Sequence, residues 1–309
     1  MLTRSQSTHE VRVGDVSLMC HVRGRGPLCV VHPGGPGLHW EYLRMPLIER
    51  DLTMVYLEPA GTGGSSGLPD GARYDLNTYV DHLAAVVREF AVDPVFVMGH
   101  AHGGFVAQGL ALRMPDHVAG LILYATAPLA DEHTRALARE GLRVSAVRCG
   151  DEHAAAVIVD AYDRPPGDGV DDETRRLRDI FPAYFADYRH RQAEFTALRD
   201  ALRCWPRPVT DFDVRAALSS IGAPTLVLAG VHDFAFGPGS AELFRSAVAG
   251  ATLRAFEDSG HFPHVEEAER FAHLIREFAG RVSGLIRTGH YRPAATTVGS
   301  IRQVSVQRH

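Results

Sequence analysis

Short runs of hydrophobic residues alternate along the chain with segments whose hydrophobic residues recur at helical spacing. Around Gly14-Asp15, hydrophobic and polar residues alternate, which is typical of a β-hairpin. Further runs are continuously hydrophobic, as in strands covered on both faces; they occupy residues 28–31, 53–57, 94–97, 118–124, 224–230 and 251–256. Helices are predicted over residues 40–50, 78–90, 105–114 and 266–278. This alternation favours an α/β fold with a doubly wound, parallel sheet.

The alternation is interrupted once. Residues 130–215 contain long polar, arginine-rich helical stretches, so we expect a helical cap inserted into the α/β core. The core would then comprise residues 1–129 and 216–280. Residues 281–309 show no strong pattern, and we expect a C-terminal tail that is either disordered or docked on a neighbouring subunit.

Composition narrows the classes of function. The chain has 309 residues, 45% of them hydrophobic, which is enough for one large α/β domain. A net charge of −5 without a basic block argues against nucleic acid as a partner, and no hydrophobic run is long enough to span a membrane. The N-terminus lacks the apolar core of a secretion signal, and the four cysteines show no disulfide or metal spacing. We therefore expect a cytoplasmic protein with reduced thiols.

Residues 98–104, Met-Gly-His-Ala-His-Gly-Gly, lie between a predicted strand and a predicted helix. In this context the pattern G-x-S-x-G presents a nucleophilic serine on a sharp turn, and Ala101 stands in the place of that serine. Such a turn needs small neighbours, here Gly99 and Gly103, and a positive φ that costs a non-glycine residue about 1–3 kcal/mol. That strain makes sense where a side chain must be presented. We interpret Ala101 as a replaced catalytic serine and favour deliberate substitution to trap a ligand; the alternatives are a natural pseudo-enzyme and a serine-independent enzyme.

Two further residues follow predicted strands in the order that this chemistry uses. Asp233 comes after strand 224–230, and His261 comes after strand 251–256. A histidine within hydrogen-bond reach takes the proton of a serine hydroxyl, and a buried carboxylate fixes the tautomer of the histidine. The oxyanion that develops needs fixed donors, for which we expect the backbone amides of His102 and Gly35.

On these residues the chain resembles the α/β-hydrolases and, within them, the proline iminopeptidase group. The resemblance covers about residues 28–126 and 222–278, and it includes the sequence Ser-Gly-His-Phe-Pro-His-Val-Glu of residues 259–266. It implies a mostly parallel, eight-stranded sheet with an inserted helical cap. Cleavage after an N-terminal proline would also require carboxylates of the cap to bind the amine of the substrate, and Glu194 is a candidate.

We expect the substrate to be bound by Gly34, His100, Phe185 and Tyr188. His100 either lines the pocket or braces the turn. The two aromatic residues belong to a stripe that either lines an apolar pocket or forms the core of the cap; the stripe comprises Phe181, Tyr184, Phe185, Tyr188 and Phe195.

Other polar residues near the predicted site have less defined roles. Glu58 follows a strand end, and we expect it either to hydrogen-bond the oxyanion loop or to touch substrate. His100 and His102 are two residues apart, as metal ligands can be, but the sequence suggests no third ligand. We predict no metal and no cofactor.

We therefore predict a serine hydrolase that cleaves an ester, lactone or amide bond of a small molecule or short peptide through an acyl-enzyme, with Ala101 removing the acylation route. Three alternatives remain: an acyltransferase or cyclase that uses the same triad, a cofactor-independent oxygenase that uses the His–Asp pair, and a ligand-binding pseudo-enzyme. The sequence does not identify the substrate or the oligomeric state, for which a homodimer is one option.

Overall fold

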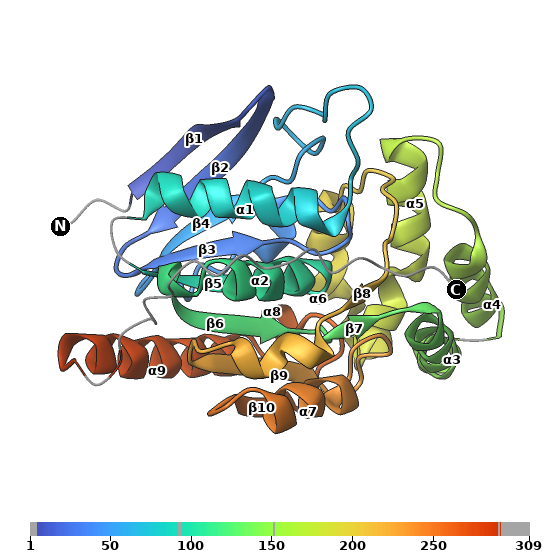
Figure 1. Cartoon of the computed structure of the whole chain (residues 1–309). Helices are drawn as coiled ribbons and strands as arrows, with labels where there is room; N and C mark the ends of the chain where they lie inside the picture. Colours follow the sequence, from blue (N-terminus) through green and yellow to red (C-terminus); the bar gives the residue numbers. More distant parts are fainter. Residues whose placement is uncertain (1–4, 92–93, 151, 290, 292–309) are drawn as a thin grey trace.

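A computed structural model describes residues 5–91, 94–150, 152–289 and 291. Its centre is an eight-stranded sheet in the order β1-β2-β4-β3-β5-β6-β9-β10, which confirms the predicted α/β fold class (Figure 1). The β1–β2 and β2–β4 pairs are antiparallel, and every further pair is parallel. The strands are β1 (Ser5–Val13), β2 (Val16–Gly24), β3 (Leu28–His32), β4 (Thr53–Leu57), β5 (Val95–His100), β6 (Val118–Tyr124), β9 (Thr225–Gly230) and β10 (Thr252–Phe256).

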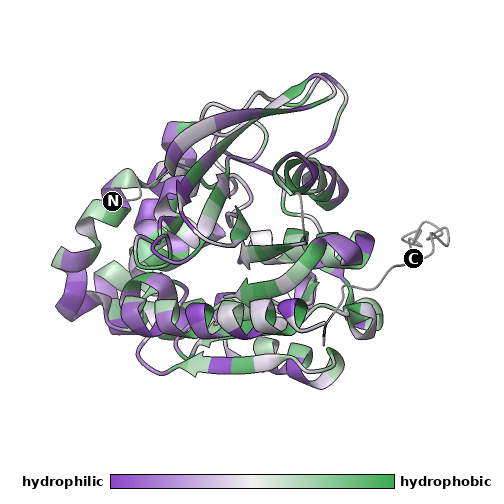
Figure 2. Cartoon of the chain, turned by 90° about the vertical axis from the view of Figure 1, so that its left-hand side faces the viewer, coloured by the Kyte–Doolittle hydropathy of each residue, from purple (hydrophilic) through white to green (hydrophobic). Residues whose placement is uncertain are grey.

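Helices cover both faces of the sheet. Helices α1 (Leu76–Phe90), α2 (His102–Arg113) and α7 (Pro238–Ala247) bury their apolar stripes on one face, where Leu83, Val106 and Phe244 are fully buried. Helix α9 (Ala268–Arg287) packs on the other face. Figure 2 shows the central strands mainly in the hydrophobic colour, with hydrophilic stretches on the surrounding helices. The continuously apolar strands are therefore covered on both faces, as their sequences predict.

The predicted cap region forms four helices joined by short connections: α3 (Glu132–Cys149), α4 (Glu152–Asp163), α5 (Val170–Ile180) and α6 (Tyr188–Ala201), with the 3-10 helix η3 (Phe181–Tyr184) between the last two. The chain enters and leaves this region through a two-stranded antiparallel ribbon of β7 (Leu129–Ala130) and β8 (Phe212–Asp213). The short 3-10 helices η2 (Pro115–His117) and η4 (Arg215–Ser220) lie in the core part of the chain. In Figure 1 helices α3, α4 and α5 lie beyond β7 at one end of the sheet, and α6 lies nearer to α2.

The structure corrects the prediction of a helix over residues 40–50. Only η1 (Trp40–Leu43) is helical, and turns follow it. Pro46 explains the early end, because proline lacks an amide hydrogen and disfavours helical geometry in the residue before it.

The C-terminal helical region also differs from the prediction. It is divided into α8 (Pro263–Glu266) and α9 by Glu267, whose backbone is not helical, with φ −127° and ψ 51°. Helix α9 continues to Arg287, beyond the predicted end of the core at residue 280, because Val282 extends the buried stripe of Phe271, Ile275 and Phe278. Of the predicted tail, residues 290 and 292–309 lie outside the described residues. Within the part of the chain that the structure describes, no helix is long and apolar enough to cross a membrane.

The approach of α2 to the sheet leads to a prediction about stability. A Cβ at Gly103 would lie 2.2 Å from the backbone oxygen of His32, which belongs to a central strand. We expect Gly103→Ala to lower the free energy of unfolding by about 1–3 kcal/mol or more, because overpacked backbone has little room to relax. Urea denaturation measures this change.

Gly280→Ala is the matched control. Gly280 is exposed in α9, and a Cβ there meets nothing within 4 Å. This substitution should raise the free energy of unfolding by up to about 1 kcal/mol, through helix propensity. Equal effects of the two substitutions would contradict the close approach of α2 to the sheet.

Candidate active site

The turn between β5 and α2 has the conformation that the sequence predicts. Ala101 has φ 49° and ψ −118°, and it is 6% exposed. A Cβ at Gly99 would lie 2.3 Å from the backbone oxygen of Gly103, so both positions need glycine for strand and helix to meet. The turn therefore presents the side chain of residue 101 at the carboxyl edge of the sheet.

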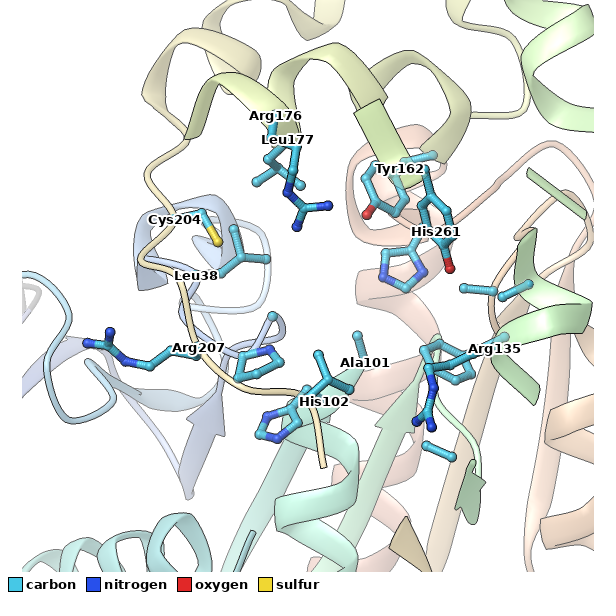
Figure 3. A pocket seen from close by; sticks show the side chains of 18 of the residues that line it. Leu38, Ala101, His102, Arg135, Tyr162, Arg176, Leu177, Cys204, Arg207 and His261 are labelled. Atoms are coloured by element: carbon cyan, nitrogen blue, oxygen red, sulfur yellow. The ribbon is translucent and has the colours of Figure 1, made fainter. Parts of the chain in front are cut away.

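Asp233 and His261 come together at the same edge. The Nδ1 atom of His261 lies 2.9 Å from Oδ2 of Asp233, and the aspartate side chain is fully buried. Since an ionised carboxylate only accepts hydrogen bonds, Nδ1 carries the proton and Nε2 remains an acceptor. Figure 3 shows Ala101 and the ring of His261 facing one cavity, which both residues line. The imidazole is thus oriented as a base toward the space above residue 101.

Two backbone amides are candidates for binding an oxyanion. His102 is the first residue of α2, so its amide has no acceptor within the helix and lies at the positive end of the helix dipole. Gly35, with φ 112°, belongs to the loop after β3, and both residues line the cavity. A Cβ at Gly34 would lie 3.1 Å from the Cβ of Ala101, so this loop packs directly against the turn.

The cavity has a volume of about 280 Å³ and is mainly apolar. Aromatic side chains from the cap, the core and the segments after β9 and β10 line it: Phe105, Phe181, Tyr184, Phe234, Phe236 and Phe262. Arg176 of α5 points into the cavity, and its Nε lies 3.0 Å from a carboxylate oxygen of Glu173 (Figure 3). The ion pair adds a polar group to the apolar cavity, whose lining also includes Arg135 and Arg207 and therefore holds more arginine than carboxylate side chains.

The structure places two of the expected substrate-binding residues elsewhere. Phe185 and Tyr188 do not line the cavity; they pack with Phe195 in the core, where the rings of Phe185 and Phe195 stack at 4.0 Å. The aromatic stripe is not one helix, because Phe185 is extended between η3 and α6. Phe181 and Tyr184, three residues apart on η3, face the cavity instead.

His100 and Gly34 also lie behind the cavity wall. His100 is completely buried, and its Nδ1 and Nε2 atoms lie 2.7 Å from the hydroxyl of Tyr42 and 3.0 Å from the backbone oxygen of His261. It braces the turn and does not line the pocket. Gly34 is absent from the cavity lining, although its neighbour Gly35 is part of it.

Glu58 and Glu194 form hydrogen bonds or ion pairs away from the cavity and do not make the contacts with substrate or the oxyanion loop that the sequence suggests. Glu58 accepts hydrogen bonds from Trp40 and the amide of Gly64, and it lies 2.6 Å from Nε2 of His21. It therefore anchors the loop after β4, and it neither lines the cavity nor bonds the oxyanion loop. Glu194 is exposed and pairs with Arg191 at 2.9 Å.

Four histidines around the site are buried and therefore held neutral. Burial lowers the pKa of His32 to about 4, that of His264 to about 4 and that of His102 to about 3. Burial also lowers the pKa of His100 well below its usual value, helped by the neighbouring His261 and His264. Among the described residues, no group of three or more His, Cys, Asp or Glu side chains has metal-binding geometry.

Comparisons with known proteins identify the family of the chain and proteins with a similar fold. The sequence profile described as "Alpha/beta hydrolase family" matches residues 29–274. The chain is 28% identical over 276 residues to the 2-hydroxymuconate semialdehyde hydrolase of Pseudomonas sp. (strain CF600), covering 87% of this chain and 92% of the relative. It is 26% identical over 281 residues to the proline iminopeptidase of Heyndrickxia coagulans, covering 84% and 92%. The crystal structure of VinJ has a TM-score of 0.69 at 21% identity, covering 89% of this chain and 99% of that one.

The buried histidines predict that stability falls in mild acid. The unfolded chain binds a proton at each of them below about pH 6.5, whereas in the folded protein His32, His264 and His102 do so only near pH 4 or lower, and burial holds the pKa of His100 well below its usual value. Between pH 6.5 and 5 the free energy of unfolding should fall by about 1–2 kcal/mol per histidine. Glu266, whose pKa burial raises to about 7, acts in the opposite sense, but it is one group against four.

Urea denaturation at pH 7 and pH 5 measures this loss. His102→Phe keeps an aromatic ring beside Phe105 and Tyr79 but removes one buried base, so the loss should shrink by about a quarter. A free energy of unfolding that does not change between the two pH values would contradict the burial of these histidines.

Proposed function

The chain belongs to the alpha/beta hydrolase family, and from this premise we propose that it carries a serine-hydrolase site with alanine at the nucleophile position. The observation that carries the proposal is the buried Asp233–His261 pair beside the positive-φ turn of Ala101. A family fold alone would not support it, since one fold hosts many functions. A side chain on a strained turn, next to an oriented base, is what nucleophilic catalysis requires.

With serine at position 101, the site supports a two-step acyl transfer. The serine oxygen attacks the carbonyl carbon of the substrate while Nε2 of His261 takes the hydroxyl proton. Asp233 holds Nδ1 and stabilises the imidazolium, and the amides of Gly35 and His102 bind the oxyanion. His261 then gives its proton to the leaving group, and a water molecule, activated by the same histidine, releases the acyl group. The bond cleaved is an ester, lactone or amide.

With alanine at position 101, no oxygen is present to form the acyl-enzyme. The remaining parts of the site keep their positions, and the cavity gains the space of one oxygen atom. We propose that this chain binds its substrate without acylating it and that it is an inactive variant of a serine hydrolase.

The cavity supports a small, largely apolar acyl or leaving group. Its volume of about 280 Å³ and its aromatic lining suit a small molecule or the first residues of a peptide. Two relatives are named for different substrates, one for 2-hydroxymuconate semialdehyde and one for proline, so relatedness alone does not select the substrate. Recognition of a substrate amine receives little support here, because Glu194 lies outside the cavity and Glu173 is already paired with Arg176.

Restoring the serine tests the proposal. Ala101→Ser should hydrolyse p-nitrophenyl acetate with a burst of p-nitrophenol equal to one equivalent of enzyme, because acylation precedes release of the acyl group. The unmodified chain should show only the background rate. Stopped-flow absorbance measures both.

Variants of the pair provide the control. In the Ala101→Ser protein, Asp233→Asn should lower kcat by about 10⁴-fold, because the histidine loses the partner that fixes its tautomer. Asp163→Asn, at an exposed ion pair of the cap, should leave kcat unchanged. Background rates for Ala101→Ser, despite native folding, would sink the proposed function.

A further inference from the structure

Tyr42 is buried behind the site and contacts three of the segments that build it. Its hydroxyl accepts a hydrogen bond from the amide of Gly34 at 2.7 Å and lies 2.7 Å from Nδ1 of His100. Its backbone oxygen lies 3.0 Å from Nε2 of His264. The residue is 5% exposed and does not line the cavity. It therefore contacts the loop of Gly34 and Gly35 (the oxyanion loop), the end of β5 at His100, and the loop of His261 and His264 (the histidine loop). It does not line the cavity in which a substrate would lie.

The donors in this network follow from the acceptors. The backbone oxygen of His261 can only accept, so the Nε2 atom of His100 at 3.0 Å carries a hydrogen. Since burial keeps His100 neutral, its Nδ1 has no hydrogen and accepts from the hydroxyl of Tyr42. The same hydroxyl accepts from Gly34, so both of its hydrogen-bonding functions are satisfied.

The bonds form a closed ring. It runs from Tyr42 through His100 to the backbone of His261, along the chain to His264, and back to the backbone oxygen of Tyr42. The side chains involved are buried, and hydrogen bonds in such surroundings are costly to break. The amide of Gly34 is attached to this ring, next to the proposed oxyanion donor Gly35.

We propose that Tyr42 is a positioning residue that sets the distance between the oxyanion donors and the catalytic histidine. The inference rests on the proposed function, because it assigns Tyr42 a role in the same site. Without the hydroxyl, the amide of Gly34 loses its acceptor and Nδ1 of His100 loses its donor. The oxyanion loop can then shift relative to His261, whereas the aromatic part of the cavity lining, such as Phe181 and Phe234, stays in place.

Tyr42→Phe in the Ala101→Ser protein tests the role. It should lower kcat about ten- to a hundred-fold, since misplacing a catalytic group by about 1 Å has an effect of this size. KM should stay within about two-fold, because Tyr42 does not line the cavity and transition-state interactions alone are lost. Steady-state kinetics on an activated ester separate the two constants.

Tyr124→Phe is the matched control. Tyr124 is fully buried, and its ring lies 4.5 Å from the ring of His100. Its hydroxyl has no hydrogen-bond partner among the described residues. Removing this hydroxyl breaks no bond of the ring, so kcat should remain within about two-fold of the Ala101→Ser value. Equal kcat values for the two phenylalanine variants would overturn the inference.

A second measurement needs no turnover and separates this inference from the proposed function. Long-range ¹H–¹⁵N spectra of the histidine rings in the unmodified chain should show His100 neutral, with its proton on Nε2. Tyr42→Phe should shift the ¹⁵N signals of both His100 and His261, and Tyr124→Phe should leave those of His261 in place. A proton on Nδ1 of His100, or unshifted signals in Tyr42→Phe, would overturn the ring even if Ala101→Ser is active. If the spectra are as expected but Ala101→Ser is inactive, the hydrogen-bonded ring is supported and the proposed function is contradicted.

Discussion

The close packing of β5 against α2 is the constraint on which the rest of the site depends. Gly99 and Gly103 bring strand and helix to a separation that leaves no room for a Cβ, and the turn between them forces Ala101 to positive φ. Strain of this kind persists only where the surrounding structure holds it. The parallel order of β5, β6, β9 and β10 then delivers Asp233 and His261 to the same edge as the turn. A shift of α2 away from the sheet would move residue 101 and so change its position relative to the imidazole of His261.

The side chains that surround the site are buried, and hydrogen bonds join the loops that carry them. Four neutral histidines and several aromatic rings surround the cavity, and His102 is part of its lining. The hydrogen bonds of Tyr42 join the oxyanion loop to His100. The cap is tied to the histidine loop as well. The amide of His261 donates to the backbone oxygen of Tyr184, and the carboxylate of Glu266 accepts from the amides of Gly260 and Ala186. The part of the cavity wall that η3 forms and the side chain of His261 are therefore held in fixed positions relative to each other.

The sequence predicted the parts of the site that depend on chain order and backbone sterics. Parallel strands place their carboxyl ends together, so a turn residue, an aspartate and a histidine after three strands were expected to meet. The sequence-based prediction was wrong where tertiary packing determines which way a side chain points. Tyr184 and Phe185 are adjacent in the sequence and both belong to the predicted aromatic stripe. Tyr184 nevertheless faces the cavity and Phe185 faces the core, because the chain leaves helical geometry between them. The sequence around His100 does not distinguish a residue that braces the turn from one that binds substrate, because its hydrogen-bond partners Tyr42 and His261 are 58 and 161 residues away.

We propose that position 101 is the nucleophile position of a hydrolase. Intact-protein and peptide mass spectrometry after treatment with a fluorophosphonate test it most directly, because the reagent modifies serine only where a base and an oxyanion site activate it. We expect one adduct in the Ala101→Ser protein, located at residue 101, and none in the unmodified chain. An adduct at another residue, or none in the folded Ala101→Ser protein, would contradict it.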